Sequence, residues 1–282
     1  MSVSALATLR PFPLPMPDQP LQAGGHEDEE TTTHLRLVLR PRADVLQPPQ
    51  DIGEHGFHRW VLGHHIAFGV WRMLIDHFGS MLREGQTEHS MVDAAAWYDR
   101  YSAAQLYAGS CGPQLYAAAI RPRMVAFNPA FSGVWARDYE RVIGLLTELN
   151  PPAYGVLRHA LKRHRLVHMG LAGLLVPDGK SLLKRAGRKA SGQTTDSERD
   201  QFDAFFMIER RPVHACQFRA QMLHRLAAAR CDLLRHPIEF AGWHLIEDLL
   251  AADVPTYLRD IAIDLLDLPP QEPQCALTNA SV

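Results

Sequence analysis

The sequence predicts an all-α fold, a single helical domain with a pocket between its helices. Apolar residues recur at intervals of three and four along most of residues 57–268, as on the buried face of amphipathic helices. Only one short segment alternates in the manner of a strand. We expect residues 32–270 to form the domain, with a proline-rich, disordered tail at 1–31 and a second disordered tail at 271–282.

The composition is that of an ordinary globular protein, and its one unusual feature is 15 histidines, a residue suited to metal binding and proton transfer. The net charge of −2 gives no general attraction to nucleic acid or to anionic membranes. No apolar run reaches the roughly 20 residues of a membrane span, and the N-terminus lacks the apolar core of a signal peptide. The four cysteines form no CxxC pair. We therefore expect a cytoplasmic protein without disulfides or structural zinc, and its state as monomer or homo-oligomer stays open.

The longest amphipathic stretch, residues 57–82, is predicted to be the central helix. Its apolar stripe follows helical spacing without a gap through Phe57, Val61, His64, Phe68, Trp71, Ile75, Phe78 and Leu82. The width of the stripe indicates a largely buried helix. His64 and His65 lie at or beside it. Each is either a hydrogen-bonded core residue or a residue that faces an internal pocket.

Ahead of this helix, the segment HLRLVLRPR alternates apolar and polar residues. Leu35, Leu37 and Leu39 fall on one side, which predicts a short strand. Pro41 ends this strand or confines it to a sheet edge.

A second histidine-bearing helix is predicted after two prolines at positions 151 and 152. Its apolar stripe includes His164 and His168, which are therefore neighbours one turn apart. The pair can share a metal ion, one of the two can hold a planar cofactor, or both can belong to a helix interface. The glutamate of an HExxH zinc helix is absent.

Between these helices, residues 127–140 read FNPAFSGVWARDYE and do not form a continuous element. Phe127, Phe131 and Trp135 stand among Asn-Pro and Ser-Gly turn signals, and Arg121 and Arg137 lie close by in the sequence. The segment is either a ligand-binding loop or a loop that packs its own aromatic side chains.

The sequence contains no P-loop, no GxGxxG after a strand, no GxSxG elbow and no CxxCH haem-attachment motif. What remains is a pair of histidine-bearing apolar helices, an aromatic loop and nearby arginines. An apolar pocket between helices with an axial histidine is a common way to hold haem.

The segment from His65 to Trp71, HIAFGVW, resembles the distal helix of tryptophan 2,3-dioxygenase, where tryptophan follows a distal histidine by six residues. The histidine content and residues 127–140 more closely resemble the haem-dependent L-tyrosine 3-hydroxylases of the same superfamily, which supply L-DOPA for antibiotic-type natural products. This resemblance covers roughly residues 51–268. It implies haem b, a histidine axial ligand, hydrogen peroxide as oxidant and L-tyrosine or a related aromatic amino acid as substrate.

On this resemblance, His65 is the distal, catalytic histidine and His168 the axial iron ligand, with His164 as the second choice. Arg165 is expected to reach the haem propionates. Phe127, Phe131 and Trp135 would enclose the substrate ring, and Arg137 or Arg121 would bind its carboxylate. A related methyltyrosine hydroxylase carries HxxxC, with its cysteine bonded to haem. Here Ala172 stands at that position, so we expect haem without a covalent link.

Two alternatives stay open at this point. The first is a haem-dependent oxygenase of tryptophan or indole. The second is a helical protein that binds haem or another ligand without catalysis.

Overall fold

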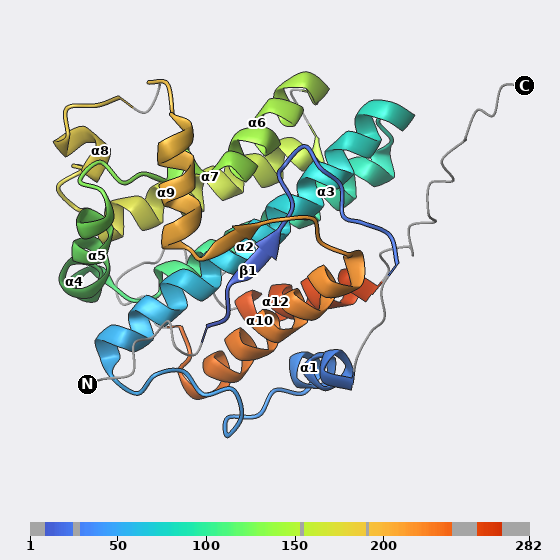
Figure 1. Ribbon diagram of the computed structural model, residues 1–282. Coiled ribbons are helices and arrows are strands. Elements are labelled where there is room, and N and C mark those ends of the chain that lie inside the picture. The colour runs from blue at the N-terminus through green and yellow to red at the C-terminus, as the bar shows by residue number, and fades with distance from the viewer. Residues whose placement is uncertain (1–8, 25–28, 153–154, 190–191, 239–252, 267–282) are drawn as a thin grey trace, which may run out of the picture.

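The computed structural model describes residues 9–24, 29–152, 155–189, 192–238 and 253–266, and it confirms the predicted all-α class (Figure 1). Its elements in chain order are β1 (Phe12–Leu14), α1 (Glu29–Leu39), α2 (Ile52–Glu84), α3 (Glu88–Gly109), α4 (Pro113–Leu115), the π-helix η2 (Tyr116–Ile120), α5 (Arg121–Phe127), the 3₁₀ turn η3 (Gly133–Trp135), α6 (Arg137–Leu149), α7 (Val156–Leu175), α8 (Leu182–Arg185), α9 (Asp196–Phe205), β2 (Ile208–Arg210), α10 (Ala215–Arg235) and α12 (Val254–Leu266). None of these helices is both long and apolar enough to span a membrane.

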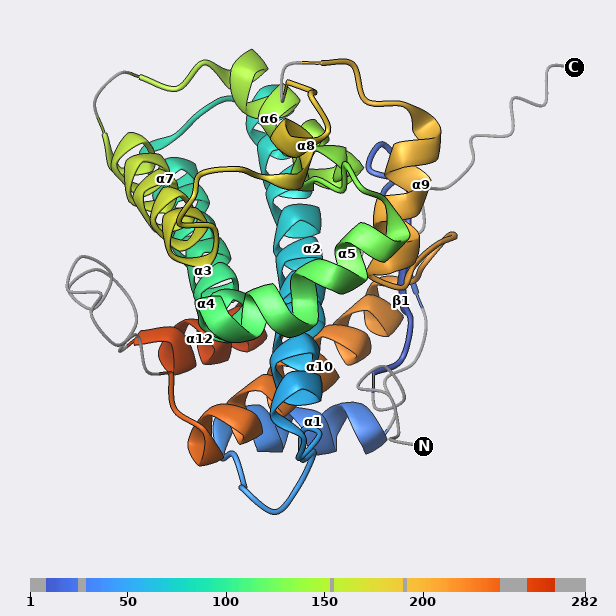
Figure 2. The same ribbon diagram turned by 90° about the vertical axis from the view of Figure 1, so that its left-hand side faces the viewer.

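Helix α2 is the central element, as its sequence stripe predicts (Figure 2). Asp51 caps its start by accepting a hydrogen bond from the backbone N–H of Glu54 at 2.9 Å, and Gly85 ends it with a φ of 97°. Buried residues occur on most of its surface because neighbours enclose it. Helices α3, α6 and α10 all pack against α2.

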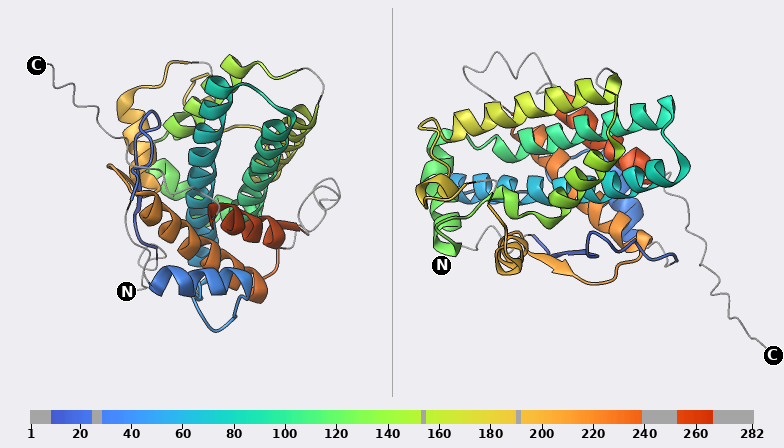
Figure 3. Two further views of the ribbon diagram at one scale, coloured as in Figure 1. Left: turned by 90° about the vertical axis from the view of Figure 1, so that its right-hand side faces the viewer. Right: turned by 90° about the horizontal axis from the view of Figure 1, so that it is seen from above.

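The other helices form groups around α2 (Figure 1). Helix α7 lies along α3, as the view from above shows (Figure 3). Helices α1, α10 and α12 contact one another on another side of the molecule. Helices α4, α5 and α8 lie toward one end, next to α9. The buried side chains of all these groups belong to one continuous hydrophobic core.

The proline-rich segment at residues 9–24 is ordered, which corrects the prediction of a disordered tail over that range. Strand β1 pairs in parallel with β2, with Phe12 opposite Ile208, and Phe12 is fully buried. Prolines lack N–H donors, so the segment needs mainly partners for its carbonyl groups. Buried arginines provide them: Arg225 donates to the carbonyl groups of residues 10 and 11, and Arg72 to those of 17 and 19. The predicted tail at 271–282 lies outside the described residues.

The segment predicted as a strand is helix α1. Its buried residues are Thr31, His34 and Val38, whose spacing of three and four faces α10. The alternation of leucines at 35, 37 and 39 misled the prediction, because none of these side chains is fully buried. The helix that the sequence suggests over residues 238–252 falls almost entirely outside the described residues.

Candidate active site

A cavity opens between α2, α3 and α7 and extends beneath the segment that precedes α6. It consists of a larger chamber of about 770 Å³ and a smaller, more apolar chamber of about 290 Å³. The two chambers share wall residues on all three helices: His64 on α2, Gln105 and Ala108 on α3, and His168 on α7. They are therefore two parts of one site, with both histidines where they meet.

His64 presents one side of its imidazole to this cavity. Its Nδ1 lies 2.6 Å from the carbonyl oxygen of Trp60, one turn earlier in α2, so Nδ1 carries the proton and donates it. Its ring stacks on Phe206 at 4.3 Å, which fixes the orientation. Burial lowers the pKa of His64 to about 4, so the ring is neutral at pH 7. Nε2 is then an unprotonated nitrogen, able to bind a metal or accept a proton.

His168 reaches the same cavity from α7, and its exposed surface borders the cavity. Its Nδ1 lies 3.2 Å from the side-chain amide of Gln105. Partial desolvation by the surrounding protein lowers the pKa of His168, so it too is neutral at pH 7. The Gln105 oxygen Oε1 is buried and has no hydrogen-bond partner among the described residues. Rotating the amide by 180° places this oxygen as acceptor for His168 Nδ1–H. A histidine that binds a metal usually donates its other ring N–H to an acceptor in this way, and the arrangement leaves Nε2 for the metal.

The walls of the cavity suit a planar group with polar contacts at its edges. Gly63, Ala67, Ala104 and Ala108 form a surface of small side chains on α2 and α3. Two tryptophans on the walls, Trp60 and Trp71, have buried indole N–H groups without partners in the described parts of the chain. Such unpaired donors are uncommon in protein interiors.

Charged groups lie at two places on the cavity wall. Arg121 borders the smaller chamber, where it donates to the carbonyl oxygen of Lys180 at 2.6 Å. Arg199 borders the larger chamber and pairs with Glu140 at 3.0 Å. The larger chamber also contains Tyr101 and Tyr139. It therefore combines aromatic surface with both signs of charge, as a zwitterionic aromatic amino acid requires.

The structure places His65 away from this cavity. Its Nε2 donates to the carbonyl oxygen of Phe206 at 2.6 Å, and its Nδ1 accepts from Arg225 Nε at 3.1 Å. With both ring nitrogens engaged and the side chain fully buried, His65 is a core residue. The cavity-facing histidine of α2 is its neighbour His64, which the stripe in the sequence already contains.

The other predicted site residues divide into two groups. His168, Phe131 and Arg121 border the cavity. The residues that do not border it are His164, Arg165, Phe127, Trp135 and Arg137.

Each of these five has a structural reason for its position. His164 is buried behind the wall, stacked on Tyr101 at 4.2 Å and paired with Ser102 at 3.1 Å. Trp135 is buried in the core, whereas Arg165 and Phe127 are exposed. Arg137 is committed to an ion pair with Asp203 at 2.9 Å.

The fold and the cavity together define a helical protein whose interior can hold a planar, metal-containing cofactor beside histidines of α2 and α7. Residues 17–166, more than half of the 282-residue chain, match the family SfmD 3-methyl-L-tyrosine peroxygenase. The chain belongs to this family of haem-dependent aromatic oxygenases and is an enzyme of the oxidoreductase class. No curated protein gives a significant match. The family match includes His64 and ends just before His168.

Several cavity residues could not be singled out from the sequence. Gln105, Trp60 and Arg199 carry no local motif. His64 is different, because its place on the apolar stripe of α2 was a usable signal. The sequence could not show which of His64 and His65 faces the cavity. That depends on which neighbouring element supplies hydrogen-bond partners to each imidazole.

Proposed function

We propose that the cavity binds haem b and that the enzyme uses hydrogen peroxide to hydroxylate the ring of a tyrosine derivative. The observation that carries this proposal is the pair of neutral histidines, His64 and His168, on the walls of one cavity. In our proposal His168 Nε2 would hold the haem iron, because its Nδ1 lies beside the Gln105 amide. Arg121 is the candidate partner for a haem propionate.

Small-molecule pockets in proteins have volumes of up to roughly 1,000 Å³. The combined volume of the two chambers, about 770 Å³ and about 290 Å³, is at this upper end. This supports binding of a macrocycle and an amino acid at the same time. When bound, haem supplies the two-electron chemistry that transfers one peroxide oxygen to carbon. A ring C–H bond becomes C–OH, the peroxide O–O bond breaks, and the other oxygen leaves as water.

The protein's own part in the reaction is to place the substrate and to move protons. His64 Nε2 is the candidate general base for the proton of peroxide or of the substrate phenol. Arg199 is the candidate partner for the substrate carboxylate, and Glu140 for its ammonium group. Tyr139 and Trp71 are candidates to enclose the ring. Arg121 remains a second candidate for the carboxylate.

For the substrate we propose 3-methyl-L-tyrosine, on the strength of family membership. L-Tyrosine, giving L-DOPA, is the second candidate, because residues 127–140 resemble the corresponding segment of L-tyrosine 3-hydroxylases. An extra methyl group that fits a pocket typically contributes about 10-fold or more to discrimination. In either case the product is a catechol amino acid suited to natural-product assembly.

Product analysis tests this proposal. Haem-loaded enzyme is incubated with ¹⁸O-labelled peroxide and 3-methyl-L-tyrosine, L-tyrosine or L-tryptophan in parallel. We expect a catechol that carries one labelled oxygen, formed fastest from 3-methyl-L-tyrosine. Reactions without haem or without peroxide are the controls. The proposal is refuted if neither 3-methyl-L-tyrosine nor L-tyrosine is oxygenated. Oxygenation of tryptophan alone would move the enzyme to the indole-oxidising branch.

A further inference from the structure

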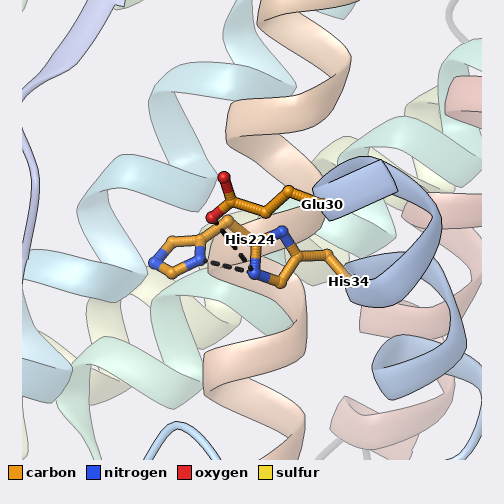
Figure 4. Close-up of side chains that lie close together, drawn as sticks. All are labelled: Glu30, His34 and His224. Atoms are coloured by element: carbon orange, nitrogen blue, oxygen red, sulfur yellow. Dashed lines mark hydrogen bonds and ion pairs between the residues drawn. The ribbon is translucent and has the colours of Figure 1, made fainter. Parts of the chain in front are cut away.

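A second histidine cluster lies outside the cavity, between helices α1 and α10 (Figure 4). It consists of Glu30 and His34, one turn apart on α1, and His224 on α10. One potential ligand atom from each residue lies within 4.8 Å of the other two. None of the three residues borders the active-site cavity. The cluster therefore needs an explanation of its own.

We propose that Glu30, His34 and His224 form a binding site for a divalent transition-metal ion, with zinc as the best fit. Two imidazoles and a carboxylate are a common zinc ligand set. Tetrahedral zinc with bonds of about 2.0–2.1 Å separates its ligand atoms by about 3.3–3.4 Å. Two of the three separations bracket that value: His34 Nε2 lies 3.0 Å from His224 Nδ1 and 3.9 Å from Glu30 Oε1. The third, between Glu30 and His224, is within 4.8 Å.

The surroundings leave a place for a fourth ligand. A cavity of about 50 Å³ adjoins the three residues and is also lined by Arg10 and Gln221. A water molecule needs roughly 10–15 Å³ of such space, so the cavity can hold a metal-bound water. Arg10 Nη1 lies 3.7 Å from Glu30, but its side chain is largely exposed and can turn outward.

The position of the site indicates a structural role. The metal would join α1 to α10 next to Arg225, which holds the backbone of residues 10 and 11 and the ring of His65. It would thus fasten the N-terminal segment to the helix that supports the back of α2. The alternative is a direct hydrogen bond between the two histidines with the glutamate beside them, and the experiment separates the two.

The test uses the full-length, haem-loaded protein, first treated with a chelator that leaves haem iron in place. Zinc binding is measured by titration calorimetry in the wild type and in the variants His34→Ala, His224→Ala and Glu30→Gln. We expect one tight zinc site per chain, weakened by about 100-fold or more in the histidine variants and about 10-fold in Glu30→Gln. His89→Ala, which removes an exposed histidine that pairs with Asp93, should bind zinc like the wild type.

Two measurements on the wild type keep the proposal testable if a variant fails to fold. Zinc at 100 times its Kd should raise the Tm by about 5 °C or more over the chelator-treated sample. Absorption at the zinc edge, which haem iron does not disturb, should show two imidazole nitrogens in the first coordination shell. Absence of a tight zinc site, or equal zinc affinity in the wild type, His34→Ala and His224→Ala, would overturn the proposal.

Discussion

His65 and Arg225 form a buried pair in which Arg225 Nε donates to His65 Nδ1 at 3.1 Å. The pair connects α2 to α10, and through Nη2 of Arg225 it reaches the N-terminal segment. His65 completes the link by donating to the carbonyl oxygen of Phe206. A histidine committed in this way supports the wall that carries His64 but is not available to a ligand.

The first prediction separates the roles of these adjacent histidines. His65→Ala leaves a cavity and unpaired polar atoms, so it should lower the free energy of unfolding by about 2–4 kcal/mol. His64→Ala should cost less stability but lower the hydroxylation rate by about 10²–10⁴-fold, the usual effect of losing a general base. Urea denaturation and product assays on both variants check this. Full stability with lost activity in His65→Ala would restore His65 as the catalytic candidate.

The second prediction concerns acid sensitivity. Burial lowers the pKa of His64 to about 4 and that of His164 to about 3, below the ordinary histidine pKa of 6.5. Below pH 6.5 these histidines bind protons in the unfolded chain but stay neutral in the folded chain. Their contribution to the free energy of unfolding is therefore fully present above pH 6.5 and is lost as the pH drops toward 4. Each such histidine contributes a slope of about 1.4 kcal/mol per pH unit. Denaturation of the haem-free protein across this range should show the loss, with a shallower slope in His164→Gln. An unchanged slope in that variant would contradict the assignment.

The third prediction concerns how closely α2 and α3 approach beside the cavity. A Cβ on Gly63 would lie 2.6 Å from the Ala108 side chain and 2.9 Å from its backbone, so Gly63→Ala must push the helices apart. We expect it to lower the free energy of unfolding by about 1–3 kcal/mol. Gly173 on α7 has open space around it, so Gly173→Ala should instead stabilise by about 0.5–1 kcal/mol. Chemical denaturation of both variants decides. Equal effects would mean that the helix contact is not tight.

The fourth prediction concerns the attachment of haem. Ala172 borders the cavity one turn after His168, where a cysteine could reach a bound macrocycle. Alanine cannot form such a bond, so acidified organic solvent should extract all haem from the wild type. Haem that stays with the denatured protein would show a covalent link elsewhere. Ala172→Cys is the informative comparison, because retention of haem in this variant alone would place the macrocycle beside position 172.

The sequence was sufficient to predict the fold class, because the helical stripes of α2 and α7 are long and regular. It also placed His168 on the apolar side of α7, where the structure opens the cavity. The N-terminal segment was misjudged because its order depends on Arg72 and Arg225, which are distant in the sequence. Composition shows that such a segment has few apolar side chains, but it does not show which donors will meet its carbonyl groups.

The site was predicted less completely for a related reason. His64 and His65 are equivalent in composition and neighbouring in position, and only tertiary contacts distinguish them. Phe206 and Arg225 occupy both nitrogens of His65, whereas His64 bonds within its own helix. The aromatic segment at residues 127–140 was expected to supply the substrate pocket. It does line the cavity, with Phe131, Tyr139 and Glu140 among its wall residues, but it turns Trp135 into the core.

The absorption spectrum of haem-loaded wild type, His168→Ala, His164→Ala and His64→Ala tests the central claim most directly. We expect His168→Ala to lose haem or its histidine-ligated spectrum, and added imidazole to restore that spectrum in protein that retains haem. His164→Ala and His64→Ala should both retain bound haem. A histidine-ligated spectrum that survives in His168→Ala but is lost in His164→Ala or His224→Ala would contradict the assignment of the axial ligand.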